Sequence, residues 1–220
     1  MQATLKTSVT FEGMGLHAGL PARMKVMPAK AGSGIVFRRT DVPADVATLE
    51  VRWDHVQVMP LNTRLVNEAG VTLSTIEHVM AALAGTGVHN ALIEIDGPEV
   101  PILDGSSADF VRAILKAGLV RQASKVRVIE VLETVSVTRG EATATLAPAA
   151  EMQIDFHIDF EDSAIGVQDK SLVLANGSFV RELCDSRTFC RKVDVDTMHA
   201  NGLALGGTLE NAVVVDGDIV

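Results

Sequence analysis

A glutamate and a histidine stand side by side in the otherwise apolar stretch LSTIEHVMAALAG, residues 73–85. A carboxylate and an imidazole are groups that enzymes use for proton transfer. Because consecutive helical residues point about 100° apart, Glu77 and His78 can face one site only from the first turn of a helix, where the site lies beyond the helix end. A structural interpretation is equally open. Ser74 and Glu77 fit a capping box, and His78 fits a hydrogen-bonded core histidine.

The elements that must position this pair are indicated by hydrophobic spacing. Helices are expected over residues 76–84, 107–117 and 178–183, and a buried strand over 91–95. Glycine and proline residues after that strand force an extended loop towards Asp104, which is expected to cap the helix that follows. Strands that pack against helices on one face of a sheet predict an α+β fold of layers.

A strand-turn-strand pattern that ends at a proline occurs twice, over residues 5–28 and 126–148. The second pattern is followed by MQIDFHIDF, residues 152–160, in which apolar and polar residues alternate as in a strand. This repetition predicts two domains of similar construction, residues 1–122 and 123–220. We expect each to be a layered α/β sandwich, with helices packed between the two domains.

Composition and charge exclude several classes of function. The 220 residues carry a formal net charge of −9, and no basic cluster is longer than Arg38 and Arg39, so a nucleic-acid partner is not expected. No apolar run approaches the roughly 20 residues of a membrane span, and the N-terminal residues lack a signal-peptide pattern. These features predict a cytoplasmic protein without a transmembrane segment. Cys184 and Cys190 lack metal-type spacing and are expected to be reduced structural cysteines.

Several motifs occur in the order found in one enzyme family. TIEHVMAALAGTGVHN is preceded by GMGLHAG and followed by VPILDGSSADFV, SRTF and NGLALGGTLENAVVVD. This series resembles the zinc-dependent UDP-3-O-acyl-N-acetylglucosamine deacetylases of lipid A biosynthesis, and the similarity runs from about residue 5 to the last residue. The resemblance implies a hydrolase that removes the N-acetyl group from a UDP-sugar carrying a fatty acyl chain and leaves a free amine.

The resemblance assigns roles to four residues. In the family the histidine of the T-x-E-H motif binds zinc and its glutamate is the general base, which implies these roles for His78 and Glu77. The threonine of the R-T-F motif stabilises the tetrahedral oxyanion, which implies that role for Thr188. Phe189 would contact substrate near the metal, although plain core packing is an alternative explanation for it.

The resemblance also predicts where substrate binds. Residues 190–216 are similar to a βαβ insert that encloses the acyl chain, although core packing explains the same composition. Asp159 and Phe160 match positions near the nucleotide, whereas a lysine common in the family is replaced by Ala142. His17 matches a histidine close to the active site, without an assigned role. The positions that match the lining of the acyl passage are Val195, Ala204, Thr208, Ala212 and Val214. The histidines that match no catalytic position are His55, His89, His157 and His199.

One departure from the family concerns the metal. A catalytic zinc takes three protein ligands, and the motifs supply only His78, because no H-K-x-x-D stretch of the family type is present. We therefore expect a C-terminally truncated member that is inactive on its own, with an incomplete second domain that leaves Ile154, Phe156 and Ile158, or their neighbours on the opposite face, partly exposed. The alternative is a non-catalytic fragment or vestigial binding module on the same fold.

Overall fold

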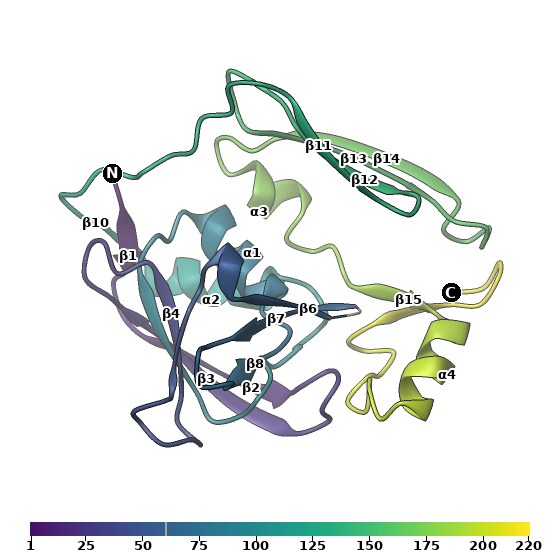
Figure 1. Ribbon diagram of the computed structural model, residues 1–220, viewed down its shortest axis with the longest axis horizontal. Coiled ribbons are helices and arrows are strands. Elements are labelled where there is room, and N and C mark those ends of the chain that lie inside the picture. The colour runs from purple at the N-terminus through teal and green to yellow at the C-terminus, as the bar shows by residue number, and fades with distance from the viewer. Residues whose placement is uncertain (60) are drawn as a thin grey trace.

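The computed structural model describes residues 1–59 and 61–220 (Figure 1). Its helices are α1 (Glu77–Thr86), α2 (Ala108–Ala117), α3 (Ser178–Glu182) and α4 (Lys192–Ala200), with a 3₁₀ turn η1 (Trp53–His55). The strands up to residue 122 are β1 (Ala3–Leu5), β2 (Val9–Met14), β3 (Pro21–Pro28), β4 (Ile35–Arg39), β5 (Thr48–Glu50), β6 (Val56–Met59), β7 (Asn62–Val66), β8 (Thr72–Leu73), β9 (Ala91–Ile95) and β10 (Leu119–Arg121). The later strands are β11 (Val135–Arg139), β12 (Ala142–Leu146), β13 (Gln153–Asp159), β14 (Val167–Val173), β15 (Phe189–Arg191) and β16 (Val213–Val215).

The largest sheet of the described residues has the strand order β2-β3-β9-β4-β5. β4 and β9 pair in parallel and the other neighbours are antiparallel. The sequence of β3 shows how the sheet acquires one buried face, because Ala22, Met24 and Val26 are buried while Arg23 and Lys25 between them face solvent. This alternation follows from the two-residue period of a strand.

Helices α1 and α2 pack into the core that this sheet covers. Phe110, Val111 and Ile114 form the buried side of α2, and the ring of Phe110 meets the ring of Phe11 on β2 edge to face at 4.9 Å. Helix α1 ends at Thr86 and is capped by Gly87, whose φ of 79° is a left-handed conformation that glycine adopts without a steric penalty. The apolar residues whose spacing predicted these two helices therefore pack in one core.

Two smaller sheets complete the part that carries α1. β6, β7 and β8 form a three-stranded sheet, and β8 leads almost directly into α1. β1 and β10 pair in antiparallel fashion, which brings Ala3 opposite Arg121 and closes the first 122 residues. The start of α1 is thus held between a sheet on one side and the core on the other.

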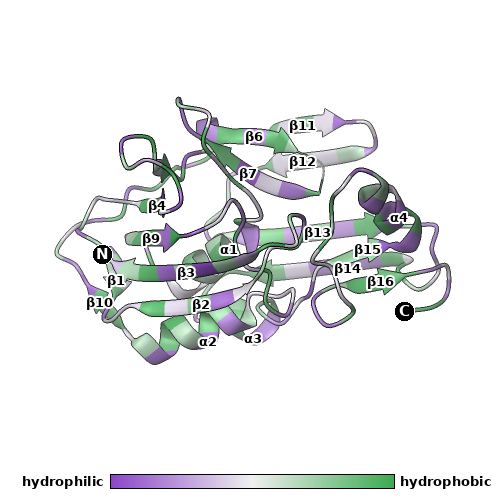
Figure 2. Ribbon diagram, turned by 90° about the horizontal axis from the view of Figure 1, so that it is seen from below, coloured by the Kyte–Doolittle hydropathy of each residue, from purple (hydrophilic) through white to green (hydrophobic). Residues whose placement is uncertain are grey.

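The later residues form hairpins and one βαβ unit. β11 pairs with β12 and β13 pairs with β14, while β15 and β16 pair in parallel and are connected through α4. Figure 2 shows hydrophobic residues along β15 and β16, which fits a parallel pair covered by a helix. Phe156 on β13 is 57% exposed and Ile154 is 39% exposed, so the alternating pattern of this strand does not face a closed core within the described residues.

One predicted strand is too long. The pattern from Val126 to Val137 predicts a continuous strand, but the strand begins at Val135. Its partner β12 supplies only five residues, from Ala142 to Leu146, and these pair with Val135 to Arg139 around a tight turn. A hairpin strand extends only as far as its partner, so the preceding residues have no ladder to join.

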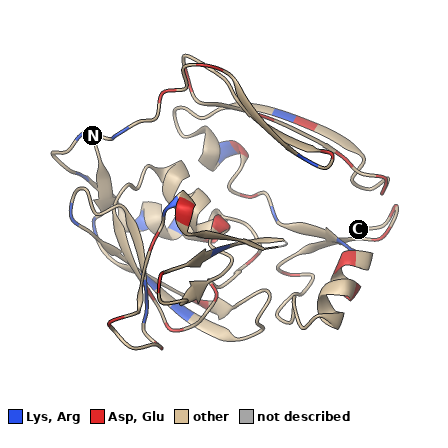
Figure 3. Cartoon of the chain, in the orientation of Figure 1, with Lys and Arg blue, Asp and Glu red and all other residues tan. Residues whose placement is uncertain are grey.

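Mixed α+β structure is confirmed, with sheets and helices sharing the core. Acidic and basic residues are dispersed along the chain (Figure 3), and the formal net charge is −9. Among the described residues, we find no helix long and apolar enough to cross a membrane.

Candidate active site

Glu77 and His78 are the first two residues of α1, as predicted. The capping-box interpretation is wrong, because the helix cap is Ile76 and the Ser74 hydroxyl instead accepts a hydrogen bond from Arg64 Nε at 2.9 Å. The Glu77 carboxylate accepts the backbone N–H of Thr63 on β7, with a distance of 3.1 Å to Oε2. Glu77 is therefore free of a capping role, and a strand from the neighbouring sheet orients it.

The His78 side chain is half-buried at this helix start. Burial lowers the pKa of its imidazole, and the negative charges of Glu77 and Asp104 oppose that shift without cancelling it. Within residues 1–59 and 61–220 its ring nitrogens make no hydrogen bond. Its backbone carbonyl accepts one from the Ser107 hydroxyl at 2.9 Å. The core-histidine interpretation expected a hydrogen-bonded ring, whereas this ring has no such bond among the described residues, and the lowered pKa favours its neutral form.

The loop of residues 104–107 joins His78 to the later half of the chain. Asp104 Oδ1 accepts the backbone N–H and the hydroxyl of Ser106, at 3.0 and 2.8 Å. The prediction that Asp104 caps the following helix is wrong, because α2 begins at Ala108 and its cap is Ser107. Asp104 instead stabilises the loop itself and directs negative charge towards His78.

Thr188 lies on the other side of the same loop. Its backbone N–H donates to the carbonyl of Gly105 at 2.8 Å, and the neighbouring Arg187 Nε donates to the carbonyl of Asp104 at 2.9 Å. Gly105 has a φ of 80°, and a Cβ there would lie 1.9 Å from the carbonyl oxygen of Asn211, so only glycine fits. The loop thus has His78 on one side and Thr188 on the other.

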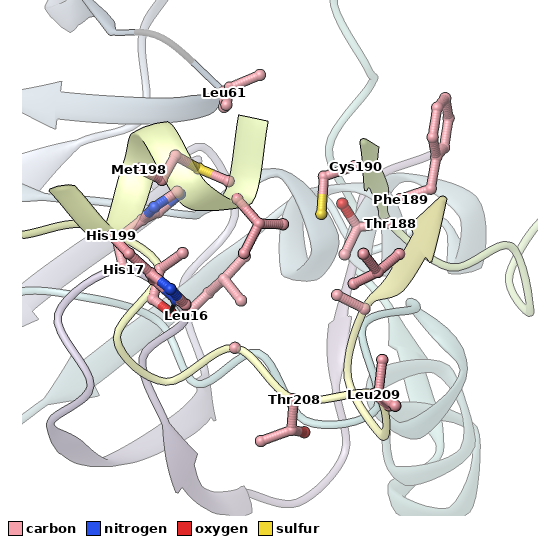
Figure 4. A pocket seen from close by; sticks show the side chains of 15 residues that line it. Leu16, His17, Leu61, Thr188, Phe189, Cys190, Met198, His199, Thr208 and Leu209 are labelled. Carbon is pink, nitrogen blue, oxygen red and sulfur yellow. Dashed lines mark hydrogen bonds between the residues drawn. The ribbon is translucent and has the colours of Figure 1, made fainter. Parts of the chain in front are cut away.

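A cavity of about 310 Å³ opens beside Thr188, between the βαβ unit and the turn of residues 15–19 (Figure 4). Seven of the residues predicted to act on or bind substrate line it together: Thr188, Phe189, Val195, Ala204, Thr208, Ala212 and Val214. In Figure 4 Thr188 and Cys190 lie on one side of the space, with Leu16 and His17 across from them. Most of the lining residues are apolar, so the cavity suits an apolar chain.

Several lining residues were not predicted from the sequence: Leu16, Leu61, Cys190, Met198, His199, Gly207 and Leu209. His17, which the sequence left without a role, also lines the cavity. It is only 6% exposed, and both of its ring nitrogens lack a hydrogen-bond partner in the described part of the chain. A buried polar group without a partner calls for an explanation, and a polar ligand atom in the cavity would provide one. Burial raises the pKa of the Cys190 thiol, which keeps it protonated.

The two residues predicted near the nucleotide lie apart from the cavity lining. The ring of Phe160 meets the ring of Phe189 at 5.6 Å, with 72° between the ring planes, so it is connected to the cavity wall. Asp159 is exposed at the end of β13, where it pairs with Val167 of β14. The structure brings Phe160 to the site and leaves Asp159 outside the lining.

The donor set around His78 does not fit a complete zinc site. A catalytic zinc takes three protein ligands and one open position. Nowhere in residues 1–59 and 61–220 do three histidine, cysteine, aspartate or glutamate side chains group closely enough to hold a metal ion.

Comparison with known proteins gives the family. The sequence profile of the UDP-3-O-acyl N-acetylglycosamine deacetylases (LpxC) matches residues 2–220. The UDP-3-O-acyl-N-acetylglucosamine deacetylase of Phenylobacterium zucineum (strain HLK1) is 46% identical over 217 residues, which cover 99% of this chain and 74% of that protein. The corresponding enzymes of Shewanella frigidimarina (strain NCIMB 400) and Citrifermentans bemidjiense are 40% and 43% identical, over 98% and 97% of this chain and 71% and 70% of their own lengths. The chain therefore belongs to the UDP-3-O-acyl N-acetylglycosamine deacetylase family.

Proposed function

We propose that the protein hydrolyses the N-acetyl group of UDP-3-O-acyl-N-acetylglucosamine, with zinc as cofactor, and releases acetate and the free amine in lipid A biosynthesis. The observation that carries this proposal is the apolar cavity beside Thr188, which joins residues from both ends of the chain at the loop that also contacts His78. The names of the relatives agree with the same reaction.

The chemistry needs a base for water and a donor for the developing oxyanion. A water oxygen attacks the acetamide carbonyl carbon while the Glu77 carboxylate accepts the water proton. The Thr188 hydroxyl donates to the oxygen of the tetrahedral intermediate. The C–N bond then breaks as the nitrogen takes up the proton that Glu77 accepted from water, which returns Glu77 to its carboxylate form. The sugar amine and acetate are the two products.

The cavity is the proposed site for the fatty acyl chain. A volume of about 310 Å³ lies at the lower end of the range of ligand pockets, which is roughly 300–1,000 Å³. Val195, Ala212 and Val214 offer apolar contacts along it, and each buried methylene contributes about 0.8 kcal/mol. The Phe160 and Phe189 rings are the proposed contacts towards the sugar nucleotide, together with Asp159.

Zinc would supply a polarised water at a neutral imidazole ligand, and His78 is the proposed ligand in this chain. Because the described residues do not group three ligands, the roles above are assigned to Glu77 and Thr188 alone. The βαβ unit of residues 190–216 is the proposed acyl-binding insert of a second domain.

A cavity-filling substitution tests the proposal. Ala212→Phe places a ring in the cavity, whereas Ala149→Phe places the same ring on an exposed position. Acetate release by the full-length protein is measured with long-chain and with short-chain acyl substrates. Ala212→Phe should lower kcat/KM for the long chain by about tenfold or more, equivalent to the lost burial of two methylenes, with little effect on the short chain. An equal loss for both substrates, or a loss in the Ala149→Phe control, contradicts the proposal.

A further inference from the structure

Glu99 is a buried carboxylate that none of the proposed steps uses. It lies in the loop between β9 and α2 and is only 3% exposed. Oε1 accepts the backbone N–H of His17 at 2.9 Å and the Thr75 hydroxyl at 2.7 Å. Oε2 accepts the backbone N–H of Ala18 at 2.7 Å and that of His17 at 3.1 Å. Burying a carboxylate is costly unless hydrogen bonds satisfy it. The backbone of His17 and Ala18 must therefore keep the conformation in which its N–H groups reach Glu99.

The turn of residues 15–19 is built around this carboxylate. A Cβ at Gly15 would lie 2.6 Å from Glu99 Oε2, so a larger residue there would displace the carboxylate. The turn closes on itself through the Gly19 N–H, which donates to the Gly15 carbonyl at 3.1 Å. Its side chains Leu16 and His17 line the cavity. The direction of these two side chains therefore depends on where Glu99 holds their backbone.

The same turn supports the loop that connects α4 to β16 in the βαβ unit. The N–H of Leu205 donates to the His17 carbonyl at 3.2 Å, and that of Gly206 donates to the Leu16 carbonyl at 3.0 Å. A Cβ at Gly206 would lie 2.2 Å from the Gly15 carbonyl oxygen, which shows how closely the two segments approach. The loop continues into Thr208, which lines the cavity. The turn itself thus forms one wall of the cavity, and the loop that forms a second wall is hydrogen-bonded to this turn.

Glu99 also contacts the segment that leads into α1. Thr75 is buried with a φ of 59°, which is unusual for a β-branched residue and needs support from its surroundings. The hydrogen bond from its hydroxyl to Glu99 provides that support, two residues before Glu77. The backbone of the adjacent Ser74 is bonded to both neighbours of Glu99, since its N–H donates to the Pro98 carbonyl and its carbonyl accepts from Val100.

We propose that Glu99 is a positioning residue, which holds the turn of residues 15–19 against the start of α1 and so sets the shape of the cavity relative to Glu77. The part of this inference that concerns the acyl chain rests on the function proposed above. Glu99 does not touch the cavity itself, because it acts through the backbone of His17 and Ala18.

Hydrogen exchange tests the positioning directly and needs no substrate. Glu99→Gln keeps the shape of the side chain but replaces one acceptor oxygen with an amide that faces backbone N–H donors. In this variant the amide protons of Ala18, Leu205 and Gly206 should exchange about tenfold faster or more, as expected when a hydrogen bond to a charged group is lost. Exchange should remain slow in β3 and β9. Faster exchange at Ala18 alone, or an equal rise throughout the sheet, overturns the proposal.

Ligand binding tests the consequence for the cavity. Calorimetry compares UDP-3-O-acyl-N-acetylglucosamine with UDP-N-acetylglucosamine, which lacks the acyl chain. Glu99→Gln should weaken binding of the acylated ligand about tenfold or more and leave the acyl-free ligand unchanged. Asp96→Asn is the matched control, because Asp96 lies in the same loop and accepts the Arg23 N–H at 2.7 Å on the exposed side of the sheet. It should change neither affinity.

The outcomes separate the two proposals. Equal weakening for both ligands in Glu99→Gln, or unchanged binding of the acylated ligand, overturns the role of Glu99 in shaping the cavity. If the wild-type protein binds both ligands equally, acyl binding in the proposed function is overturned. In that case the exchange rates at Ala18, Leu205 and Gly206 still test whether Glu99 positions the turn.

Discussion

Different elements of the fold contact the adjacent residues Glu77 and His78. The backbone N–H of Thr63 on β7 donates to the Glu77 carboxylate, whereas the backbone carbonyl of His78 accepts the Ser107 hydroxyl and its imidazole experiences the charge of Asp104. A mid-helix position would separate the two groups by about 100° around the axis with packing on both sides. From the first turn, side chains at both positions can reach a site that lies beyond the helix end.

The proposed roles predict different losses for the two residues. In the full-length protein, Glu77→Ala should lower turnover by about 10²–10⁴-fold, as is typical for a lost general base. The amount of bound metal should stay unchanged. His78→Ala should lower the metal content itself, because it removes a ligand. Elemental analysis and acetate release measure both effects, with the exposed Glu68→Ala as control. Equal metal loss in the two active-site variants would show that the roles are assigned wrongly.

At this scale the sequence predicted the motif residues but not all of their neighbours. Thr188, Val195 and Ala212 were found because ordered motifs carry them, and they do meet at one cavity. Glu99 was missed because its partner His17 lies 82 residues away along the chain. A contact between a carboxylate and distant backbone N–H groups leaves no periodic pattern in the sequence.

At the scale of elements, Arg39 connects the end of β4 to β8, the strand that precedes α1, through a hydrogen bond to Thr72. Its guanidinium donates to both carboxylate oxygens of Asp41, at 2.7 and 2.6 Å, and to the Thr72 carbonyl at 2.7 Å. Arg39 is buried, so the loss of its partner leaves a poorly compensated charge. The hydrogen bond from Arg39 holds the pKa of Asp41 below its ordinary value of 3.8.

This pair predicts a pH-dependent contribution to stability. Asp41→Asn should lower the free energy of unfolding by about 1–3 kcal/mol near neutral pH, because it removes charged hydrogen bonds. Since the folded pKa of Asp41 is depressed, its stabilisation is present above about pH 4 and is lost as the pH falls through the folded value. Urea unfolding at several pH values should therefore show the difference from wild type shrinking in acid. Asp54→Asn, in the exposed pair with Arg52, should have no measurable effect, and a constant difference for Asp41→Asn at all pH values would contradict the assignment.

Hydrophobic periodicity located three helices and some of the strands, but not which strands pair. The strand over residues 91–95 matches β9, and the three predicted helices match α1, α2 and α3 to within two residues at each end. The strand expected from Val126 starts nine residues later, because pairing length depends on β12 and not on the pattern of β11 alone. Periodicity reports which face of a segment is apolar, whereas the extent of a sheet is decided by contacts between segments.

At the scale of the whole molecule, we propose a domain boundary after residue 122. The main core is drawn from residues 5–114, together with Cys184 from the later half. The segment that follows β10 has no helix or strand from residue 122 to 134, and Ile129 is 96% exposed. Figure 1 shows this segment running from β10 to the β11–β12 hairpin along the outside of the chain.

Limited proteolysis tests that boundary. Trypsin should cut first at Lys125 or Arg127, both of which are exposed in irregular backbone. The fragment of residues 1–122 should keep its secondary structure, because the β1–β10 pair closes it and its core is nearly self-contained. Mass spectrometry identifies the cuts and circular dichroism follows the fragment. First cuts inside residues 1–122, or an unfolded fragment, would contradict the domain division.

The later hairpins predict that the 220-residue chain associates with itself. Met152, Ile154 and Phe156 expose one apolar face of β13, and further exposed apolar side chains lie on the β11–β12 hairpin. Contiguous apolar surface drives association, whereas isolated exposed residues are ordinary. The average mass in sedimentation equilibrium should therefore rise with protein concentration, and Phe156→Ser should reduce that rise. Trp53→Ser is the matched control, because Trp53 is more exposed, at 88% against 57% for Phe156, but lies on the separate turn η1. If Trp53→Ser reduced association as much as Phe156→Ser, general hydrophobicity and not the β13 face would be responsible.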